Sequence, residues 1–435
     1  MAGSLFLFLA WAGDSSPWLE TPAALLFFLL LLRGDRKLWF WSGFFLGVFW
    51  FGWIGVSFLH YGHPWAIPLV ALLVAFVYAL DFWIFALLSE TLARRLSRTF
   101  SPSHLPIQNT IDHRPSTIDQ LLGTPFKALS LLLMSYLHPF GFDWLKPELP
   151  LIHTPFGIDK LHFALLLFAL CLFLLAAQKI RKKLSFLSIL PALTALPPLL
   201  LALHPGNVQI LHADPSGKIV LAGTHVPVES KWRRKNLRPQ IQSVLQKIDR
   251  AIAQKARLVL LPESVLPLFL NRDPQLLQAL KERSRRIHIV LGSLYTAHGE
   301  NRNSAYHFYD GRYTVADKVA LVPFGEYNPL PSFLSRLVNE IFFDGAPDYR
   351  PAKRPTDFLI DGRRYRSAVC YEGTSERLYS PPPRRILLIS NDGWFVPSQE
   401  FTLQRLLLEY YVRKYGTTIY HSVNMGEPYI LKPES

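Results

Sequence analysis

The chain has 435 residues, of which 50% are hydrophobic and only 18% are charged. This length allows two or three ordinary domains, but so apolar a composition is unusual for a purely soluble protein, and membrane segments are expected. The formal net charge of +14 fits either a nucleic-acid-binding protein or a membrane protein with basic cytoplasmic loops, and the positions of Lys and Arg decide between the two classes.

The first 204 residues hold a succession of mostly apolar stretches, and a helix that crosses a membrane needs roughly 20 such residues. The stretches cover residues 3–13, 20–32, 38–59, 65–89, 126–140, 160–178 and 184–203. We therefore predict a membrane bundle of about seven spans over residues 1–204. The first, second and fifth stretches are short, and a re-entrant hairpin is an alternative for the first pair. No Lys or Arg precedes the first stretch, which indicates a retained segment rather than a cleaved signal peptide.

Basic residues mark alternate loops between these stretches. They follow the second, fourth and sixth stretches, whereas the loops at residues 14–20 and 60–64 contain no Lys or Arg. The basic positions are Arg33, Arg36, Lys37, Arg94, Arg95, Arg98, Lys179, Arg181, Lys182 and Lys183. Because Lys and Arg collect in cytoplasmic loops, the chain is expected to start in the cytoplasm and to place everything after residue 204 across the membrane. Basic clusters that are separated and next to the membrane argue against a nucleic-acid partner.

From Asn207 onward, short runs rich in leucine or β-branched residues alternate with charged amphipathic stretches. The runs VQILHA, RLVLLP, IHIVLGSL, RSAVCY and RILLISN are typical of strands, whereas residues 236–256 and 400–416 have the helical spacing of apolar positions. This alternation predicts an α/β domain with a buried sheet over residues 205–435.

Chemically useful side chains accompany several of these runs. Glu263 comes just after the apolar run of LVLLPES, and Cys370 ends the run of SAVCYEG. In DKVALVPFGEY, Lys318 comes shortly before a strand-like run and Glu326 comes after it. Taken singly, such residues are usually a solvated turn carboxylate, a surface lysine and a core cysteine. Because the catalytic groups of α/β folds gather at strand ends, we expect these side chains to meet.

Together these residues provide what acyl transfer through a thiol requires. A thiol becomes a nucleophile when a base takes its proton, and the oxyanion that then forms needs a positive charge or N–H donors beside it. A partly buried carboxylate and a lysine fit these two roles, so neither a metal ion nor another cofactor is required. The second cysteine, Cys171, lies inside an apolar run that should be buried in lipid, which argues against a disulfide.

The order Glu263, Lys318, Cys370, at nearly equal spacing, resembles the arrangement in the nitrilase (carbon–nitrogen hydrolase) superfamily. Joined to a multi-span membrane half, it resembles the apolipoprotein N-acyltransferase family. The strings LPES, KxxLVPFGEY, CYE and ISNDGWF carry the match, and LVPFGE is the most telling of them. The resemblance implies a multi-span helical membrane bundle followed by a nitrilase-like α-β-β-α sandwich.

The resemblance also implies a role for each matching residue. Glu263 would be the general base, Lys318 would stabilise the oxyanion, and Cys370 would carry the acyl group as a thioester. The residues that would support the site or bind substrate are Glu326, Trp232, Tyr371 and Glu372. Family members usually continue past the segment matching SVNMG with further strands and a final membrane helix. The domain at residues 205–435 is therefore expected to lack the usual C-terminal span.

The reaction that the resemblance implies is a ping-pong transfer between two lipids, the last step of lipoprotein maturation. Cys370 would take an acyl group from a phospholipid such as phosphatidylethanolamine, and the α-amine of the diacylglyceryl-cysteine of an apolipoprotein would then receive it. The expected setting is the bacterial inner membrane, with the catalytic domain in the periplasm. We expect a monomer whose partners are these two lipids and the membrane.

Two other functions are open on the residues alone. A membrane-tethered amidase of the nitrilase type would use the same three residues on a small amide, but a soluble substrate does not need seven spans. A transporter or scaffold would use the C-terminal half as a binding module. Apart from Asp81 the spans offer few ionisable residues for a transport path, and the Glu, Lys and Cys would then have no explanation.

Overall fold

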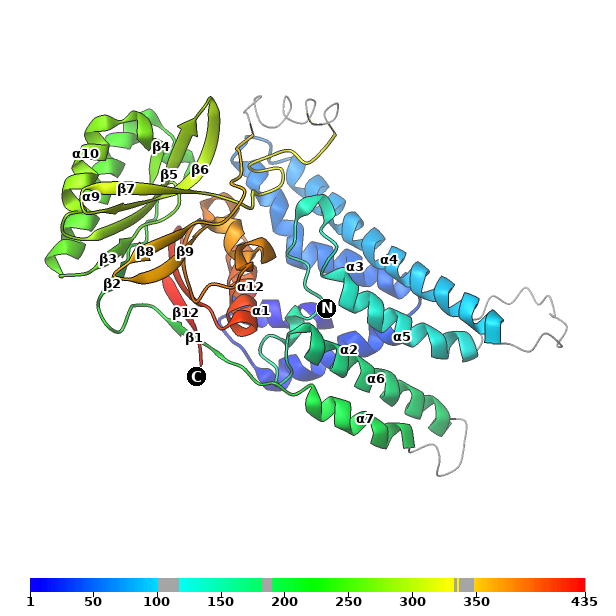
Figure 1. Ribbon diagram of the computed structural model, residues 1–435. Coiled ribbons are helices and arrows are strands. Elements are labelled where there is room, and N and C mark those ends of the chain that lie inside the picture. The colour runs from blue at the N-terminus through cyan, green and yellow to red at the C-terminus, as the bar shows by residue number, and fades with distance from the viewer. Residues whose placement is uncertain (101–116, 182–189, 332–334, 336–347, 435) are drawn as a thin grey trace. The chain divides into compact units, whose positions relative to one another are not determined.

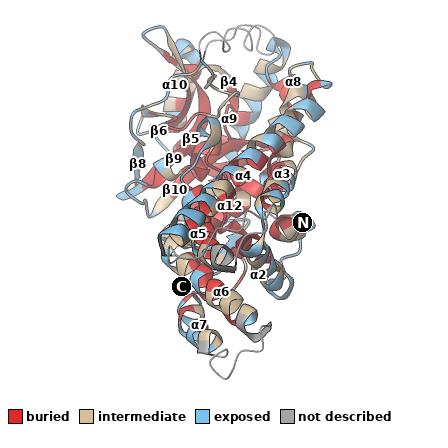
Figure 2. Ribbon diagram, turned by 90° about the vertical axis from the view of Figure 1, so that its right-hand side faces the viewer, coloured by how far each residue is buried: buried red, intermediate tan, exposed pale blue. Residues whose placement is uncertain are grey.

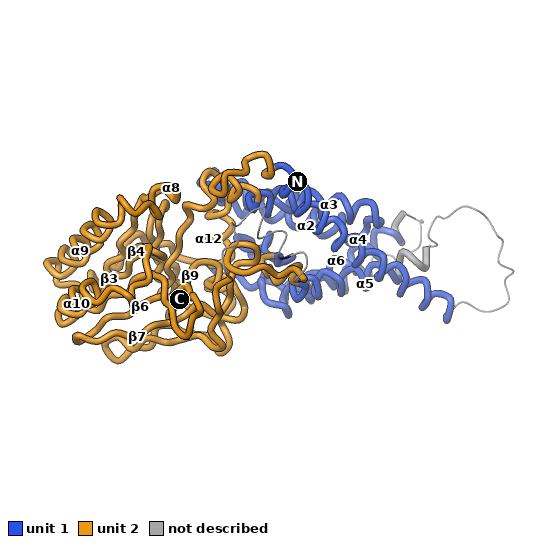
Figure 3. Tube along the Cα trace, turned by 90° about the horizontal axis from the view of Figure 1, so that it is seen from above, with its two compact units in different colours: residues 1–54, 68–137, 145–206 blue, residues 55–67, 138–144, 207–435 orange. Residues whose placement is uncertain are grey.

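The structure is a computed structural model that describes residues 1–100, 117–181, 190–331, 335 and 348–434. The chain divides into two compact units, which are coloured separately in Figure 3. The first unit consists of residues 1–54, 68–137 and 145–206, and the second consists of residues 55–67, 138–144 and 207–435. Two short segments of the apolar half thus belong to the second unit.

The first unit is mainly helical. Its helices are α1 (Leu5–Trp11), α2 (Pro17–Arg33), α3 (Arg36–Phe51), α4 (Ala66–Phe100), α5 (Thr117–Met134), α6 (Lys160–Arg181) and α7 (Leu190–Leu201). Each of the seven predicted apolar stretches overlaps one of them, and residues 184–189 of the last stretch lie outside the described residues. Among the described residues, three helical segments are long and apolar enough to cross a membrane: Arg36–Leu59, Ala66–Thr99 and Lys160–Gln178. The helices Ala2–Trp11 and Pro191–Leu201 are apolar but shorter, so seven spans remain a prediction.

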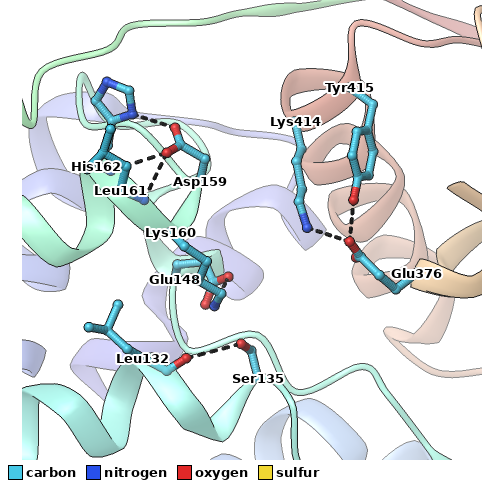
Figure 4. A network of polar contacts seen from close by, with 10 residues as sticks. All are labelled: Leu132, Ser135, Glu148, Asp159, Lys160, Leu161, His162, Glu376, Lys414 and Tyr415. Atoms are coloured by element: carbon cyan, nitrogen blue, oxygen red, sulfur yellow. Dashed lines mark hydrogen bonds and ion pairs between the residues drawn. The ribbon is translucent and has the colours of Figure 1, made fainter. Parts of the chain in front are cut away.

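Glycines allow two of these helices to approach closely. A Cβ atom added to Gly43 of α3 would lie 2.4 Å from the carbonyl oxygen of Tyr78 in α4, and one added to Gly47 would lie 2.7 Å from Cα of Ala75. Small residues at such crossings let helix backbones pack directly, which is how helices associate in a membrane. Polar side chains occur near the ends of the helices, where Lys160 of α6 pairs with the buried Glu148 at 2.6 Å (Figure 4).

The second unit contains two six-stranded sheets and covering helices (Figure 1). One sheet has the order β1-β12-β11-β10-β9-β8, and the other has β2-β3-β5-β6-β7 with β4 paired to β5. The strands are β1 (Val208–Leu211), β2 (Ile219–Leu221), β3 (Leu258–Leu260), β4 (Leu266–Phe269), β5 (His288–Ala297), β6 (Glu300–Tyr309), β7 (Arg312–Asp317), β8 (Asp357–Ile360), β9 (Arg363–Val369), β10 (Arg385–Asn391), β11 (Thr418–Asn424) and β12 (Tyr429–Pro433). The helices are α8 (Val228–Lys231), α9 (Leu237–Ala253), α10 (Pro274–Arg283) and α12 (Glu400–Tyr415).

The residues of β3 show how the layers are held together. Leu258 and Leu260 face a core that lies between the two sheets, whereas Val259 and Leu261 face a second core shared with α9 and α10. Alternate residues of a strand point to opposite faces, so β3 is apolar on both sides because both sides are covered. Helix α12 packs against the other sheet at β11 and β12. The predicted α-β-β-α sandwich is confirmed, and the buried residues in Figure 2 follow its strands.

All five predicted strands and both predicted helices of this unit are present. The strand-like run after Lys318 is not a strand, and that prediction was wrong. Its backbone amides are used differently: the N–H of Val319 donates to the Glu372 carboxylate, and that of Val322 donates to Glu326. An amide held by a side-chain carboxylate is not available for a β ladder.

Candidate functional site

Three of the predicted residues follow strands of the second unit. Glu263 comes shortly after β3, Lys318 directly follows β7, and Cys370 directly follows β9. Cys370 begins a short 3₁₀ helix, η8 (Cys370–Thr374), and has a backbone φ of 53°. A positive φ is uncommon for a residue with a side chain and is found where surrounding structure enforces it, often at functional sites.

Glu372 fastens the two segments that carry Lys318 and Cys370. It is buried, and its Oε1 accepts a hydrogen bond from the N–H of Val319 at 2.7 Å, while its Oε2 accepts one from the N–H of Val369 at 2.8 Å. The residue after Lys318 and the residue before Cys370 are thus held by one carboxylate. Burial raises the pKa of Glu372 to about 7, although these two amide donors oppose the shift.

Lys318 is held as a buried cation. Its side chain is 1% exposed, and its Nζ lies 2.7 Å from Oε2 of Glu326. Burial alone would lower the pKa of Lys318, but its acidic neighbours, first among them its ion-pair partner Glu326, raise it above its ordinary value. The site therefore contains a permanent positive charge in a region of low dielectric constant, where its effect on a nearby oxyanion is large.

Asn303 of β6 connects the two carboxylates of the site. Its Nδ2 donates to Oε1 of Glu263 at 2.7 Å and to Oε1 of Glu326 at 2.8 Å. One side-chain amide thus fixes the candidate base and the lysine's partner relative to each other. Sequence reasoning did not identify Asn303, because a polar residue in a strand carries no motif.

The ionised forms of the Cys370 thiol and of the Glu263 carboxyl group are both disfavoured. Burial raises the pKa of the Cys370 thiol well above its ordinary value, and Glu263 adds to the shift while Lys318 opposes it. Burial likewise raises the pKa of Glu263, with Lys318 opposing. The thiol therefore keeps its proton until a base takes it, and a carboxylate of raised pKa is a suitable base. This arrangement can deprotonate a thiol and stabilise an oxyanion.

Lys231 is a second buried cation of the site, which sequence reasoning also missed. Its side chain is buried, and its Nζ donates to the main-chain oxygen of Glu263 at 3.1 Å. Burial lowers its pKa to about 8, although Glu263 opposes the shift. The neighbouring Trp232, which was predicted to support the site, is 42% exposed. Within the described residues no hydrogen bond or ring contact joins Trp232 to the cluster, although its position next to Lys231 keeps it near.

Tyr371 points away from the charged cluster, toward the segment 138–144. Its hydroxyl donates to Oδ1 of Asp143 at 2.9 Å and accepts from the N–H of Asp143 at 3.0 Å. Its ring stacks on Phe142 with a centroid separation of 5.4 Å. Asp143 also accepts from the hydroxyl of Ser375 at 3.2 Å. This segment therefore supports the backbone that follows Cys370.

The segment 55–67 contacts the site at two further loops. Tyr61 stacks on Trp394 of ISNDGWF with a centroid separation of 5.7 Å, and His60 bonds to Glu229 of ESKW at 2.8 Å. Burial, followed by the charge of Glu326, raises the pKa of Tyr61 to about 12. Tyr61 therefore lies near the charged cluster. The structure brings Glu263, Lys318, Cys370, Glu326 and Glu372 together, while Trp232 and Tyr371 lie at the margin.

The Lys318–Glu326 pair gives a test of how the cluster is held. We expect Glu326→Gln to lower the free energy of unfolding by about 3 kcal/mol or more, because it leaves the buried ammonium without its closest partner. The double variant Lys318→Met/Glu326→Gln should recover most of this loss, since no unpaired charge remains, while staying inactive. Thermal and denaturant unfolding in detergent measure the stability of the single and the double variant. A single variant as stable as the wild type would show that the pair does not hold the site.

Comparisons with known proteins cover the whole chain. The family model of the apolipoprotein N-acyltransferase integral membrane domain matches residues 1–196. The apolipoprotein N-acyltransferase of Wolinella succinogenes is 38% identical over 431 residues, which is 99% of this chain and 93% of the relative. That of Helicobacter pylori is 34% identical over 407 residues, 93% of this chain and 85% of the relative. Among solved structures, a mutant of the Nesterenkonia AN1 amidase from the nitrilase superfamily is 14% identical, with a TM-score of 0.35 over 50% of this chain and 89% of that one.

The α-β-β-α domain follows an integral membrane domain, and the relatives that match both parts are membrane-bound acyltransferases. The whole-chain similarity then gives the family. This chain belongs to the apolipoprotein N-acyltransferase family. The amidase alternative is not favoured, because these relatives match the membrane and catalytic halves together.

Proposed function

We propose that this protein acylates the α-amine of the diacylglyceryl-cysteine of apolipoproteins, using an acyl group that Cys370 has taken from a phospholipid such as phosphatidylethanolamine. The reaction takes place on the periplasmic side of the bacterial inner membrane, and the protein acts as a monomer. The observation that carries the proposal is a buried network of contacts around Cys370. In it Asn303 joins Glu263 to Glu326, Glu326 pairs with Lys318, and Glu372 holds the residue after Lys318 and the residue before Cys370. The site belongs to the second unit, residues 55–67, 138–144 and 207–435.

In the first half-reaction, Glu263 takes the thiol proton of Cys370 while the sulfur attacks the carbonyl carbon of a phospholipid ester. The negative charge that develops on the carbonyl oxygen is stabilised by the Lys318 ammonium, which Glu326 keeps in place. The carbon–oxygen bond then breaks, and Glu263 returns its proton to the leaving oxygen of the lysophospholipid. An acyl thioester on Cys370 remains.

In the second half-reaction, the neutral α-amine attacks the thioester carbonyl carbon. The same lysine stabilises the second oxyanion, the carbon–sulfur bond breaks, and Glu263 passes a nitrogen proton to the sulfur. Glu372 and Tyr371 keep the nucleophile's backbone in place through their bonds to Val319, Val369 and Asp143. The exposed indole of Trp232 is suited to contact an acyl chain.

The proposal is tested by incubating the purified full chain with phosphatidylethanolamine and a diacylglyceryl-cysteine peptide. We expect mass spectrometry to show a peptide that has gained one amide-linked acyl chain, together with lysophospholipid. An otherwise identical peptide with an acetylated α-amine is the matched control and should gain no chain. Release of free fatty acid without peptide acylation would contradict the transfer and indicate a hydrolase.

A further inference from the structure

Two acidic residues that the proposed mechanism does not use lie beside Cys370. Strands β9 and β10 are parallel neighbours, with Ile389 opposite Val369. Cys370 follows β9 and Asp392 directly follows β10, so both leave the sheet at the same edge. Glu400 is the first residue of α12, which packs against η8 and against the turn that begins at Asp392.

Both carboxyl groups are buried with an oxygen that has no partner. Asp392 is 6% exposed and Glu400 is 2% exposed. Within the described residues, Oδ1 of Asp392 and Oε2 of Glu400 accept no hydrogen bond, and neither group forms an ion pair. The other oxygen of Glu400 accepts only a long bond of 3.3 Å from Gln404. Buried carboxyl oxygens are nearly always hydrogen-bonded, so unpartnered ones need an explanation.

The Asp392–Glu400 pair lies within electrostatic range of the reacting groups. After burial and Glu263, the charges of Glu400 and Asp392 raise the pKa of the Cys370 thiol. Burial raises the pKa of Asp392, and Glu263 adds to that shift. Burial also raises the pKa of Glu400, with Asp392 and Glu263 adding to it. The pair thus lies within range of both the thiol and the candidate base, and no described residue supplies it with a paired cation.

We propose that Asp392 and Glu400 form a subsite for a primary ammonium group beside the Cys370 sulfur. The inference rests on the proposed function, in which the α-amine of the apolipoprotein must approach the thioester on that sulfur. A cation that enters between the two carboxyl groups gives their unpartnered oxygens a charge-assisted donor. Phosphatidylethanolamine carries the same chemical group in its head group, so both substrates contain a ligand of this kind.

The subsite also accepts the proton that the α-ammonium group must lose before it can attack. An α-amine arrives mostly as an ammonium ion, which cannot attack. The positive charge of the bound ammonium favours ionisation of the pair and so opposes the effect of burial. The ammonium gives one proton to an ionised carboxylate, and the neutral amine then forms the nitrogen–carbon bond. The carbon–sulfur bond breaks, and a second nitrogen proton passes through Glu263 to the sulfur. Ammonium and thioester thus become amide, thiol and one proton, which the pair releases to water.

The test separates the two half-reactions in the full chain. The thioester is first formed from phosphatidylglycerol, which has no ammonium group. The acylated protein is then mixed with one of two acceptors, the diacylglyceryl-cysteine peptide or hydroxylamine, and hydroxylamine is mainly neutral near pH 7. We expect Asp392→Asn and Glu400→Gln to slow transfer to the peptide roughly tenfold or more, because a charged hydrogen-bond partner is lost. Thioester formation from phosphatidylglycerol and cleavage by hydroxylamine should stay within about twofold of the wild type. Glu409→Gln, a buried carboxylate of the same helix, is the control and should transfer normally.

A parallel loading with phosphatidylethanolamine identifies the source of the ammonium. If the variants load more slowly from phosphatidylethanolamine but not from phosphatidylglycerol, the subsite binds the lipid head group as well as the α-amine. If loading from phosphatidylethanolamine is unchanged, the subsite binds only the α-amine. If both variants transfer the acyl group to the peptide at the wild-type rate, the proposal is overturned. Asp392 and Glu400 would then be two buried acids that bind water. Slower loading from phosphatidylglycerol, in variants with unchanged thermal midpoints, would also overturn it, because the pair would then serve the thiol.

A binding measurement, which needs no acyl transfer, distinguishes failure of the proposed function from failure of the ammonium subsite. In Cys370→Ala protein, the peptide with a free α-amine should bind more tightly than its N-acetylated form, and adding Asp392→Asn should remove this preference. If the wild type forms no thioester but the preference is present, the acyl transfer fails and the ammonium subsite stands. Equal binding of the two peptides to Cys370→Ala protein would overturn the subsite.

Discussion

Replacing Cys370 with alanine should abolish the acyl adduct and lower peptide N-acylation by about 10⁴-fold or more, the scale found when a nucleophile is removed from a catalytic group that acts as a unit. No other described thiol can take its place, because Cys171 lies buried in α6 of the first unit. Mass spectrometry of the Cys370 peptide after exposure to phospholipid measures the adduct directly.

Cys171→Ala is the matched control for this substitution. It removes the other thiol of the chain and should leave both the adduct and the transfer rate unchanged. An adduct that disappears in Cys171→Ala but persists in Cys370→Ala would contradict the assignment of the nucleophile. Because the backbone of Cys370 has a positive φ, the thermal midpoint of Cys370→Ala should be measured beside its activity.

Glu263→Gln should slow thioester formation by about 10³-fold or more while leaving the protein folded. The amide of Gln has nearly the shape of the carboxyl group and keeps an oxygen that can accept from Nδ2 of Asn303, so the local hydrogen bond survives. The variant therefore removes the base and little else. Single-turnover measurement of adduct formation is the appropriate assay.

The pH dependence of the same step gives a second measure of Glu263. A general base works only when ionised, so the rate should be lost as the pH falls through the pKa of Glu263. Burial raises this pKa, and the loss should therefore occur at higher pH than for an ordinary glutamate. In Glu263→Gln this acidic limb should be absent from the residual rate. A limb that persists in the variant would assign the base to another residue.

Much of the fold was predictable because burial dictates composition. The apolar stretches of the first unit became helices, and the runs at β3, β5 and β10 became strands covered on both faces. The hairpins around β6 and β8 were missed, because β6 and β7 are rich in polar and charged residues and β8 has only four residues. A signal was present in their turns: Asp310–Gly311 and Asp361–Gly362 both adopt positive φ, and Asp-Gly between two strands is a strong hairpin signal.

The candidate site was predictable only where motifs mark it. Glu263, Lys318 and Cys370 follow strands, and their meeting follows from how strand ends gather. Asn303 and Lys231 were not predictable, because their importance lies in contacts with residues 40 and 32 positions away in the chain. The strand expected after Lys318 failed for a related reason: the Glu372 carboxylate, 53 positions away, takes the amide of Val319, and no local pattern records this.

The composition of the second unit has a consequence for how the protein is made. Tyr371 and its partner Asp143 are 228 positions apart. At synthesis rates of about 5–20 residues per second, the segment 138–144 waits roughly 10–45 s for the chain that covers it. During this time the rings of Phe142 and Trp144 lack the tyrosine on which they stack in the finished protein. Completion of the catalytic unit is therefore a late event in biogenesis.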